Sequence, residues 1–495
     1  MSDYLGYDVV IIGGGVAGCV LAARLSEDPG RSVCLVEAGP DHGPDRRSWP
    51  EGLLDARALP RDDVWEEDSA PYRIRAKVLG GSSSINGCWH TWGAQEDYAE
   101  WAGVGGPDWS EAGLEPFRRM AAERMRLRPI PDGELSAWSR GARAAAAELG
   151  YPEISDMSLP GRGTGYGCPP VNAIGDLRWN AAFGYLDAAR SRPNLRILDR
   201  ATVNRLVVGD GRVHGVELDA RGERVTLSAD LYLLAAGTYG SPAVLMRSGI
   251  GPAEHLAEVG VETQVDLPGV GANLTDHSCL VLPLTPTAEL NRALAELEAA
   301  GKLYASQVAV KAATEHCEPG TWDLHLLPTA GAPLFGTLPP GQYEVGVTAF
   351  LMKPASRGRL RLRSADPEVA PDIDPRLLAD PDGRDLAVAR RGLELAAELA
   401  ATTALKQWAS PGNAPGRATD EELRAGAGTY WHPVGTCAMG EDAVVDGEGR
   451  VHGVANLRVI DASILPTIPR SNTQLPVLAV AEMLAAKLTG QRHVE

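Results

Sequence analysis

Short apolar runs alternate with glycine turns at the start of the chain. After the polar Asp8, the rest of the run 8–12 is apolar, as is 33–36, and both are rich in β-branched side chains, which is typical of buried strands. Between them, a glycine turn opens a segment rich in Ala and Leu, which favours a helix. The order strand, turn, helix and strand predicts a βαβ unit of about 30 residues.

The glycines of this turn have the spacing GxGxxG. They are Gly13, Gly15 and Gly18, and Glu37 follows the second strand, 24 residues after the first glycine. Such glycines allow a pyrophosphate to approach the backbone, and the helix N-terminus stabilises its charge. The acid can accept hydrogen bonds from ribose hydroxyls. The pattern predicts a dinucleotide site, and the alternative is a glycine turn in another kind of α/β domain.

The hydrophobic pattern changes in the middle of the chain. Strands separated by turn glycines are predicted between residues 195 and 237. A second, antiparallel sheet is predicted from three later runs, at residues 321–330, 343–354 and 356–364. Helical periodicity is found at residues 287–301, 384–406 and 475–490. One more strand ends at Asp461, so the chain is expected to leave the first domain and later return to it.

Composition and charge narrow the class of protein. The 495 residues predict two or three domains, and 44% hydrophobic with 23% charged residues is ordinary for a globular protein. The net charge of −18 argues against nucleic acid or an anionic membrane as a partner.

No apolar run approaches the roughly 20 residues of a membrane helix, and no signal peptide is visible. Seven cysteines without a CxxC motif fit a reducing compartment, so a cytoplasmic location is expected. No cluster has metal-ligand spacing, which predicts no metal.

Two further segments carry candidate chemistry. The stretch "VLGGSSSINGCWHTWG" at residues 78–93 is rich in glycine and serine and ends in aromatic residues and a histidine. The stretch "YWHPVGTCAMG" at residues 430–440 holds His432 between a tryptophan and a proline, and the proline biases the histidine away from helix. A fixed neutral imidazole suits a general base, and a histidine that caps a turn is the alternative.

Several of these motifs together resemble the glucose–methanol–choline (GMC) family of FAD oxidoreductases. They are "GGGVAG" with Glu37, "VLGGSSSINGCWHTWG", "GTYGSPAVLMRSGIGP", "PGVGANLTDH", "WHPVGTCAMG" and "VIDASILPTIPRSNTQLP", in the family's order and over nearly the whole chain. The stretch from Ser83 to Trp101 is similar to choline-oxidase-like members. Trp431 is similar to a tryptophan of members that oxidise furanic and aromatic alcohols.

The resemblance implies an α/β fold with two domains. A Rossmann-type FAD domain is assembled from discontinuous segments, and an α+β substrate domain places an antiparallel sheet over the flavin. The expected FAD domain comprises residues 1–133, 177–288 and 427–495. The expected substrate domain comprises residues 134–176 and 289–426.

The resemblance also assigns the cofactor contacts. The three glycines of the first turn hold the pyrophosphate together with Val16 and Ala17, and Glu37 and Ala38 meet the ribose. Trp65 and Val203 meet the adenine. The remaining contacts surround the flavin and its ribityl chain: Gly80, Gly81, Ser82, Asn86, Gly87, Cys88, Trp89, Ala236, Gly237, Asp461, Ala462, Thr473 and Gln474. Some members attach FAD covalently through a histidine at a position that is Ile85 here, so non-covalent FAD is expected.

For catalysis, the resemblance implies His432 as the general base. Gln474 is assigned to the second family position, where its amide would donate to the alkoxide, and Asn472 is the alternative for that role. The candidate pocket residues are His90, Trp92, His325 and Trp431. His277 is expected to be structural, with Asp276 as its partner.

The expected function is oxidation of a CH–OH donor, a primary alcohol, by hydride transfer to the flavin N5. Oxygen or a redox carrier then takes the electrons. Three alternatives are a lyase or decarboxylase on the same fold, an FAD-binding protein without turnover, and an NAD dehydrogenase. The last is disfavoured because the later FAD-type segments would have no purpose.

Overall fold

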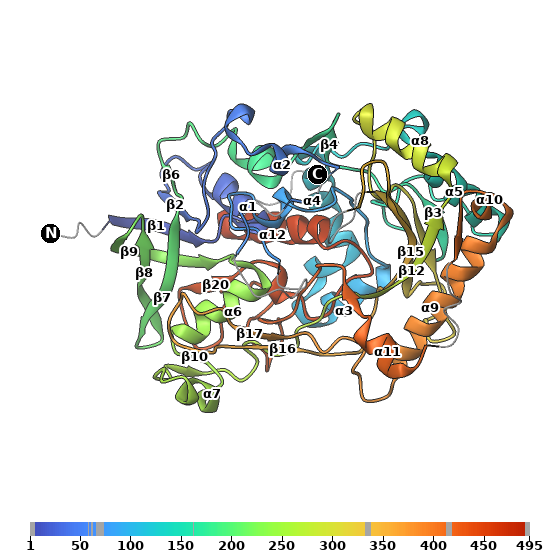
Figure 1. Ribbon diagram of the computed structural model, residues 1–495. Helices are drawn as coiled ribbons and strands as arrows, with labels where there is room; N and C mark the ends of the chain where they lie inside the picture. The colour runs from blue at the N-terminus through green and yellow to red at the C-terminus, as the bar shows by residue number, and fades with distance from the viewer. Residues whose placement is uncertain are drawn as a thin grey trace.

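The computed structural model describes residues 5–57, 59–60, 63–65, 74–161, 163–331, 338–411 and 418–490. Two seven-stranded sheets stand at opposite ends of the molecule, and helix α12 (Gln474–Thr489) lies between them (Figure 1). Among the helices in the described ranges, none has the length and hydropathy needed to span a membrane.

The first sheet has the strand order β6-β2-β1-β9-β8-β7. Its parallel strands are β1 (Leu5–Ile12), β2 (Val33–Val36), β6 (Leu195–Leu198), β9 (Glu223–Leu234) and β20 (Leu457–Val459). The strands β7 (Ala201–Gly209) and β8 (Arg212–Ala220) extend it as an antiparallel meander. Beyond residue 231, β9 pairs with β20 instead of β8. The C-terminal segment therefore completes a sheet that the N-terminal segment began.

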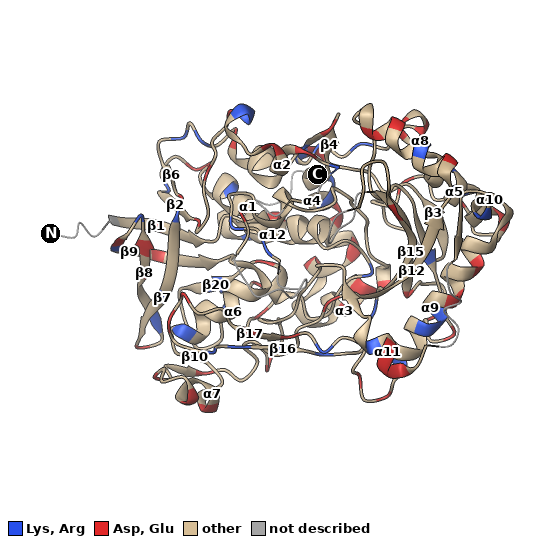
Figure 2. Ribbon diagram, in the orientation of Figure 1, with Lys and Arg blue, Asp and Glu red and all other residues tan. Residues whose placement is uncertain are grey.

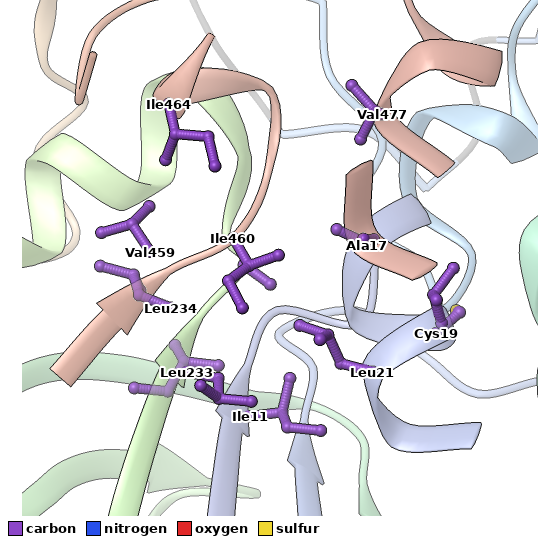
Figure 3. Packing of buried hydrophobic residues seen from close by; sticks show 14 of the residues in the cluster. Ile11, Ala17, Cys19, Leu21, Leu233, Leu234, Val459, Ile460, Ile464 and Val477 are labelled. Atoms are coloured by element: carbon purple, nitrogen blue, oxygen red, sulfur yellow. The ribbon is translucent and has the colours of Figure 1, made fainter. Parts of the chain in front are cut away.

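The core of this domain joins the two ends of the chain. Helix α1 (Val16–Leu25) packs on β1 and on α12. Figure 3 shows Ile11 and Leu21 from the N-terminal unit in one apolar cluster with Leu233, Ile460 and Val477. Because these side chains share one core, the expected discontinuous Rossmann-type domain is confirmed.

The second sheet is wholly antiparallel, with the order β18-β12-β15-β14-β13-β3 and β19 paired to β12. Its strands are β3 (Gly165–Gly167), β12 (Ser278–Pro286), β13 (Ala309–Ala312), β14 (Leu324–Gly331), β15 (Glu344–Leu351), β18 (Ala409–Pro411) and β19 (Gly428–Thr429). Helices α5 (Ala137–Glu148), α8 (Ala288–Ala299), α9 (Arg384–Ala401) and α10 (Thr403–Lys406) pack around it (Figure 1). A third apolar cluster joins its other face to Cys88 and Trp89. The expected antiparallel sheet is thus confirmed.

Three sequence expectations need correction. Residues 278–286, expected in the FAD domain, form β12, which lies between β15 and the edge strands β18 and β19 of the second sheet. The run 356–364 contributes β16 (Arg359–Arg361), which pairs with β17 (Asp372–Asp374) outside that sheet. The predicted helix 384–406 is broken at Thr402, whose extended backbone caps α10.

The remaining elements lie outside the two large sheets. They are η1 (Arg46–Ser48), α2 (Glu51–Leu54), η3 (Gly81–Ser84), α3 (Gln95–Gly105), η4 (Pro107–Trp109), α4 (Glu111–Arg124), η5 (Asp132–Glu134), β4 (Ala173–Ile174), β5 (Leu177–Arg178), η6 (Ala182–Leu186), α6 (Gly237–Arg247), β10 (Ile250–Gly251), α7 (Ala253–Glu258), β11 (Val265–Asp266), α11 (Asp420–Ala425) and η8 (Ala462–Ile464). Many Asp and Glu residues belong to helices such as α8, α9 and α11 (Figure 2).

The tightest glycine contact lies in the first turn. A Cβ on Gly18 would stand 1.8 Å from the carbonyl oxygen of Gly13, so Gly18→Ala is expected to destabilise the protein by about 3 kcal/mol or more. Gly103 on α3 has open space around its Cα, and Gly103→Ala is the matched control, expected to be neutral or to stabilise by up to about 1 kcal/mol. Urea unfolding of the two variants measures the difference. Equal midpoints would contradict the packing of this turn.

Candidate functional site

The first glycine turn leaves a helix end free. Gly13 has φ of 103°, and the N-cap Gly15 offers α1 no side chain, so the first N–H groups of the helix are available to an anion. Both carboxylate oxygens of Glu37 accept backbone hydrogen bonds, from Gly14 at 2.8 Å and from Gly39 at 2.7 Å. Burial raises the pKa of Glu37, and the two N–H groups oppose that rise. The acid therefore also braces the turn.

A second glycine loop rests directly on the first. The N–H of Gly80 donates to the carbonyl of Gly14 at 2.8 Å, and a Cβ on Gly81 would stand 2.6 Å from the Cα of Gly15. Ser82 lies in the short helix η3 that follows. Only glycine permits this approach of two backbones, so the loop at 80–81, which is expected to line the flavin, lies directly against the turn that is expected to hold the pyrophosphate.

Asp461 stands at the junction of two segments. It accepts from the backbone N–H of Gly237 at 2.9 Å, from Ser241 Oγ at 2.5 Å and from the N–H of Ser463 at 2.8 Å. Burial is the main cause that raises its pKa. The carboxylate therefore joins the start of α6, and with it Ala236, to the turn that carries Ala462.

The predicted adenine contacts come from two segments that are far apart in the chain. Trp65 is partly buried, with the Lys77 ammonium 4.5 Å from its ring centroid. Val203 is buried in β7, beside an irregularity in the pairing with β8. Val16, Ala38 and Thr473 are partly exposed, whereas Ala17 is buried.

The side chain of His432 belongs to a hydrogen-bonded chain that fixes its tautomer. Nε2 of His277 lies 3.1 Å from the carbonyl oxygen of Pro469, which can only accept, so Nε2 of His277 carries the proton. Nδ1 of neutral His277 is then an acceptor, and it lies 3.0 Å from Nδ1 of His432. His432 therefore carries its proton on Nδ1 and keeps the lone pair on Nε2.

The free nitrogen of His432 faces the amide of Asn472. Nδ2 of Asn472 lies 3.4 Å from Nε2 of His432. Thr91 fixes the orientation of this amide, because its hydroxyl donates to Oδ1 of Asn472 at 2.9 Å and accepts from the backbone N–H of Asn472 at 2.8 Å. A lone pair and an N–H donor thus converge at one place, as the oxygen of an alcohol requires.

The backbone before His432 is strained and held. Trp431 has φ of 58°, a left-handed conformation that costs a bulky residue about 1–3 kcal/mol. Asp276 accepts from the backbone N–H of His432 at 2.9 Å and from the hydroxyl of Thr429. Thr429 Oγ1 in turn accepts from the N–H of Trp431 at 2.9 Å. Burial raises the pKa of Asp276 to about 6. These contacts stabilise the turn that presents the imidazole.

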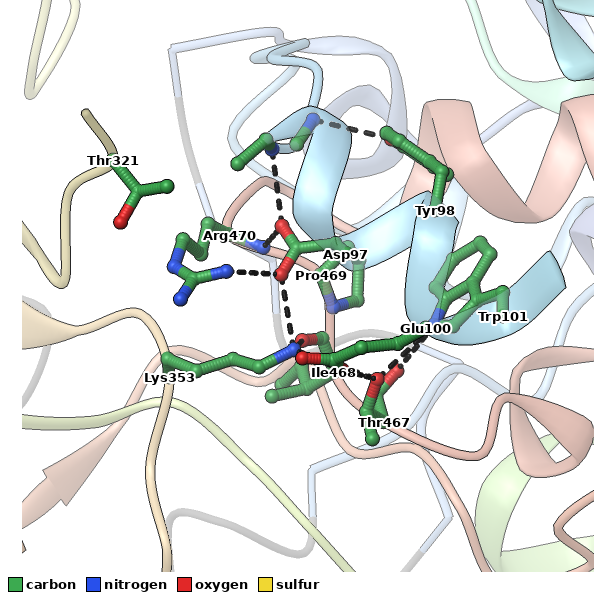
Figure 4. Close-up of polar contacts among 12 residues, drawn as sticks. Asp97, Tyr98, Glu100, Trp101, Thr321, Lys353, Thr467, Ile468, Pro469 and Arg470 are labelled. Carbon is green, nitrogen blue, oxygen red and sulfur yellow. Dashed lines mark hydrogen bonds and ion pairs between the residues drawn. The ribbon is translucent and has the colours of Figure 1, made fainter. Parts of the chain in front are cut away.

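Residues 467–472, called the strap below, carry the carbonyl of Pro469 and the amide of Asn472. Figure 4 shows the strap held by Asp97 on α3. Asp97 accepts from the guanidinium of Arg470 at 2.6 Å, from its backbone N–H at 2.8 Å and from Lys353 Nζ at 3.0 Å. Asp97 and Arg470 are almost fully buried, so this ion pair is shielded from solvent.

The electrostatic surroundings keep His432 neutral. Desolvation lowers its pKa well below the ordinary value, and the positive charge of Arg75 acts in the same direction. Burial likewise lowers the pKa of His277 to about 3. Both imidazoles are therefore uncharged at neutral pH, which a proton-accepting Nε2 requires.

The geometry corrects the expected role of Gln474. Its amide oxygen accepts from Nδ2 of Asn86, and its Nε2 is buried without a partner among the described residues. Gln474 is the first residue of α12, whereas Asn472 precedes the helix and is tied to Thr91. The donor beside His432 is therefore Asn472.

Two other expectations change. Asp276 was expected to be the partner of His277. The ring of His277 instead contacts Pro469 and His432, and the carboxylate of Asp276 accepts from the backbone N–H of His432. Trp92 stacks on Tyr98 in the core of the first domain, with ring centroids 4.6 Å apart, so it does not line a substrate site.

The other expected pocket residues differ in burial and in their distance along the chain from His432. His90 is fully buried, and burial lowers its pKa to about 4. His325 lies on β14, and Trp431 is partly exposed beside His432. Cys88 has φ of 60° and donates its N–H to Asn86, whereas Gly87 is exposed.

The roles of Thr91 and His277 in orienting Asn472 and His432 were not predicted from the sequence. Thr91 lies in the segment 78–93, and His277 ends the "NLTDH" motif, so both belong to motifs that the sequence marks as important. The sequence alone does not show that their hydrogen-bond partners lie between 155 and 381 residues away along the chain. No group of side chains within the described ranges has the arrangement of a metal site.

The site has two parts with different tasks. Two glycine loops and the uncapped ends of α1 and α12 suit a dinucleotide, and the unpartnered Nε2 of Gln474 at the second helix end suits a ring carbonyl. The neutral histidine beside an amide handles one proton. This is the division of labour of a flavin-dependent oxidoreductase.

The chain belongs to the GMC oxidoreductase family, whose members bind FAD and act on alcohol groups. Two models described as GMC oxidoreductase match residues 7–279 and 354–481. The 5-(hydroxymethyl)furfural oxidase of Methylovorus sp. is 34% identical, over 99% of this chain and all of that protein. An oxygen-dependent choline dehydrogenase of Paraburkholderia phymatum is also 34% identical, over 98% of this chain and 93% of that protein. The crystal structure of pyridoxine 4-oxidase from Mesorbium loti matches with a TM-score of 0.85 at 28% identity, over 98% of this chain and all of that one.

The hydrogen bond between the two histidines yields a test. His277→Leu removes the acceptor for Nδ1–H of His432, frees the ring to take the other tautomer, and is expected to slow anaerobic flavin reduction by about tenfold or more. His277→Asn keeps an acceptor near the position of Nδ1 and is expected to retain most of the rate. Stopped-flow absorbance measures both, at equal FAD content. Equal rates in the two variants would mean that the acceptor has no part in positioning His432.

Proposed function

We propose that this protein oxidises a primary alcohol to the aldehyde, with His432 as general base and Asn472 as hydrogen-bond donor to the alcohol oxygen. The observation that carries the proposal is the convergence of Nε2 of His432 and Nδ2 of Asn472, 3.4 Å apart. The fixed tautomer of His432 and the fixed amide of Asn472 both serve one bound hydroxyl group.

Each residue then has a defined task. His432 accepts the hydroxyl proton at Nε2, while Asn472 donates to the oxygen as its negative charge grows. Bound FAD supplies a hydride acceptor for the carbinol carbon. The strained turn at Trp431 and the strap hold the two groups in place, because a small displacement of the reacting atoms is costly.

The relatives support a primary alcohol. The Methylovorus enzyme is named for 5-(hydroxymethyl)furfural, whose hydroxymethyl group is a primary alcohol. The relatives named above are oxidases and a dehydrogenase, so they lend no support to the lyase or decarboxylase alternative. Oxygen or a small redox carrier is the proposed electron acceptor, and admitting air to the reduced protein distinguishes the two.

His432→Asn and Asn472→Ala test the two roles. The first is expected to slow anaerobic flavin reduction by roughly 10²-fold or more and the second by roughly 10–10²-fold. Because the pKa of His432 is lowered, its neutral form persists into acid, and the acid limb of kcat/KM in the wild type is expected below the ordinary histidine value of about 6.5. Stopped-flow rates from pH 5 to 9 measure both effects. Unchanged reduction in His432→Asn would remove it from the role of base.

We also propose that the FAD is held non-covalently. Ile85 occupies the position where an attached histidine is expected, and isoleucine offers no nucleophile. Acid precipitation is expected to leave the yellow flavin in the supernatant, where its absorbance is measured. Flavin that stays in the pellet would show a covalent link from another residue.

A further inference from the structure

Two polar side chains lie side by side on one face of the second sheet. The register of β13 and β14 pairs Lys311 with His325. Their strand neighbours Val310 and Leu324 belong to the core beneath α9. Since side chains alternate along a strand, Lys311 and His325 point to the opposite face, which carries the apolar cluster with Cys88 and Trp89.

The charge of Lys311 has no acidic partner. Its side chain is only 2% exposed, and no Asp or Glu within the described ranges lies at ion-pair distance from it. Asp97 contributes to its electrostatic environment, but both oxygens of Asp97 are already bound to Arg470, Lys353 and backbone (Figure 4). The ring of Trp322 lies 3.8 Å from Nζ, which gives a cation–π contact and no neutralisation. A buried ammonium of this kind calls for an anion.

His325 adds an unsatisfied donor. Its side chain is fully buried, and neither ring nitrogen has a hydrogen-bond partner among the described residues. Burial, together with the positive charge of Lys311, lowers its pKa well below the ordinary value. The ring is therefore neutral and presents one N–H to a ligand.

The pair lies on the face that leads to His432. His325 is the cross-strand neighbour of Phe350, which stacks on Tyr430 with ring centroids 3.7 Å apart. Tyr430 lies 4.2 Å from His432 between ring centroids. Two strand spacings, roughly 10 Å, separate β13 from β15. Lys311 and His325 are thus placed for the far end of a ring-sized or medium-chain alcohol.

We propose that Lys311 and His325 form a carboxylate-binding subsite, so that the preferred substrate is a primary alcohol with a carboxylate at its other end. The inference rests on the proposed function of His432. One ammonium and one neutral N–H match the single charge and two oxygens of a carboxylate. A phosphate dianion would leave a buried negative charge unpaired. Burial lowers the pKa of Lys311 to about 8, so the amine is still mostly protonated at pH 7.

Matched pairs of alcohols test the subsite. The pairs are 4-(hydroxymethyl)benzoate against 4-(hydroxymethyl)benzamide and 6-hydroxyhexanoate against 6-hydroxyhexanamide, which differ in charge at nearly equal size. We expect the wild type to favour the carboxylate of at least one pair by about tenfold or more in kcat/KM, and Lys311→Met to abolish or reverse that ratio. The ratio within one variant is insensitive to a general loss of activity. Lys311→Arg should keep the preference, and Lys302→Met, on the surface after α8, is the control that leaves it unchanged.

Binding provides a second readout that needs no turnover. 4-Methylbenzoate lacks the hydroxyl group, and its binding is followed by the perturbation of the flavin spectrum. We expect Lys311→Met to raise its Kd by about tenfold or more. Equal Kd values in wild type and Lys311→Met, or a substrate ratio that Lys311→Met does not change, would overturn the subsite. If no alcohol reduces the flavin while 4-methylbenzoate binds through Lys311, the proposed function fails and the subsite stands.

Discussion

The geometry of the reactive groups depends on the contact between the buried carboxylate of Asp97 and Arg470. The carboxylate reaches from α3 to the strap and binds Arg470 through both its guanidinium and its backbone. The residue before Arg470 supplies the carbonyl that fixes the tautomer of His277, and the strap ends at Asn472. A charged pair shielded from water in this way is costly to break, by about 3–5 kcal/mol, because the remaining charge would stay buried. The same pair that stabilises the fold therefore sets the direction of two reactive side chains.

The tautomers of His277 and His432 are set by groups that cannot change between donor and acceptor. A carbonyl oxygen only accepts, so the proton positions of both histidines follow from the carbonyl of Pro469. At the other side, the hydroxyl of Thr91 donates to one end of the Asn472 amide and leaves the other end to face Nε2 of His432. Neither the base nor the donor needs to reorganise when an alcohol binds, and preorganisation of this kind is the main source of electrostatic catalysis.

The sequence predicted the parts of this protein that rest on local pattern. The GxGxxG turn with Glu37, the antiparallel sheet near 321–354 and the closing helix with Pro476 in its first turn all follow from periodicity and turn residues. The sequence did not predict the side-chain roles that depend on hydrogen-bond partners far apart in the chain. Gln474 and Asn472 are two residues apart and chemically alike, and only the start of α12 and the position of Thr91 separate their roles. Likewise Asp276 adjoins His277 in sequence, yet its oxygens reach the backbone of His432.

A base with a lowered pKa is available at neutral pH but binds its proton weakly. What drives the transfer is the difference between the pKa of His432 and that of the bound alcohol, and the absolute value of either matters less. Arg75 lowers the pKa of His432 by its positive charge, and a positive charge nearby also favours an alkoxide over an alcohol. Asn472 acts on the alkoxide as a donor, while it cannot stabilise the protonated imidazole in the same way. Most of the described Asp and Glu residues are at least partly exposed, so the field at the site is set by these few buried groups and the helix ends. The surroundings that make His432 a weaker base therefore also make the proton of the bound alcohol easier to remove.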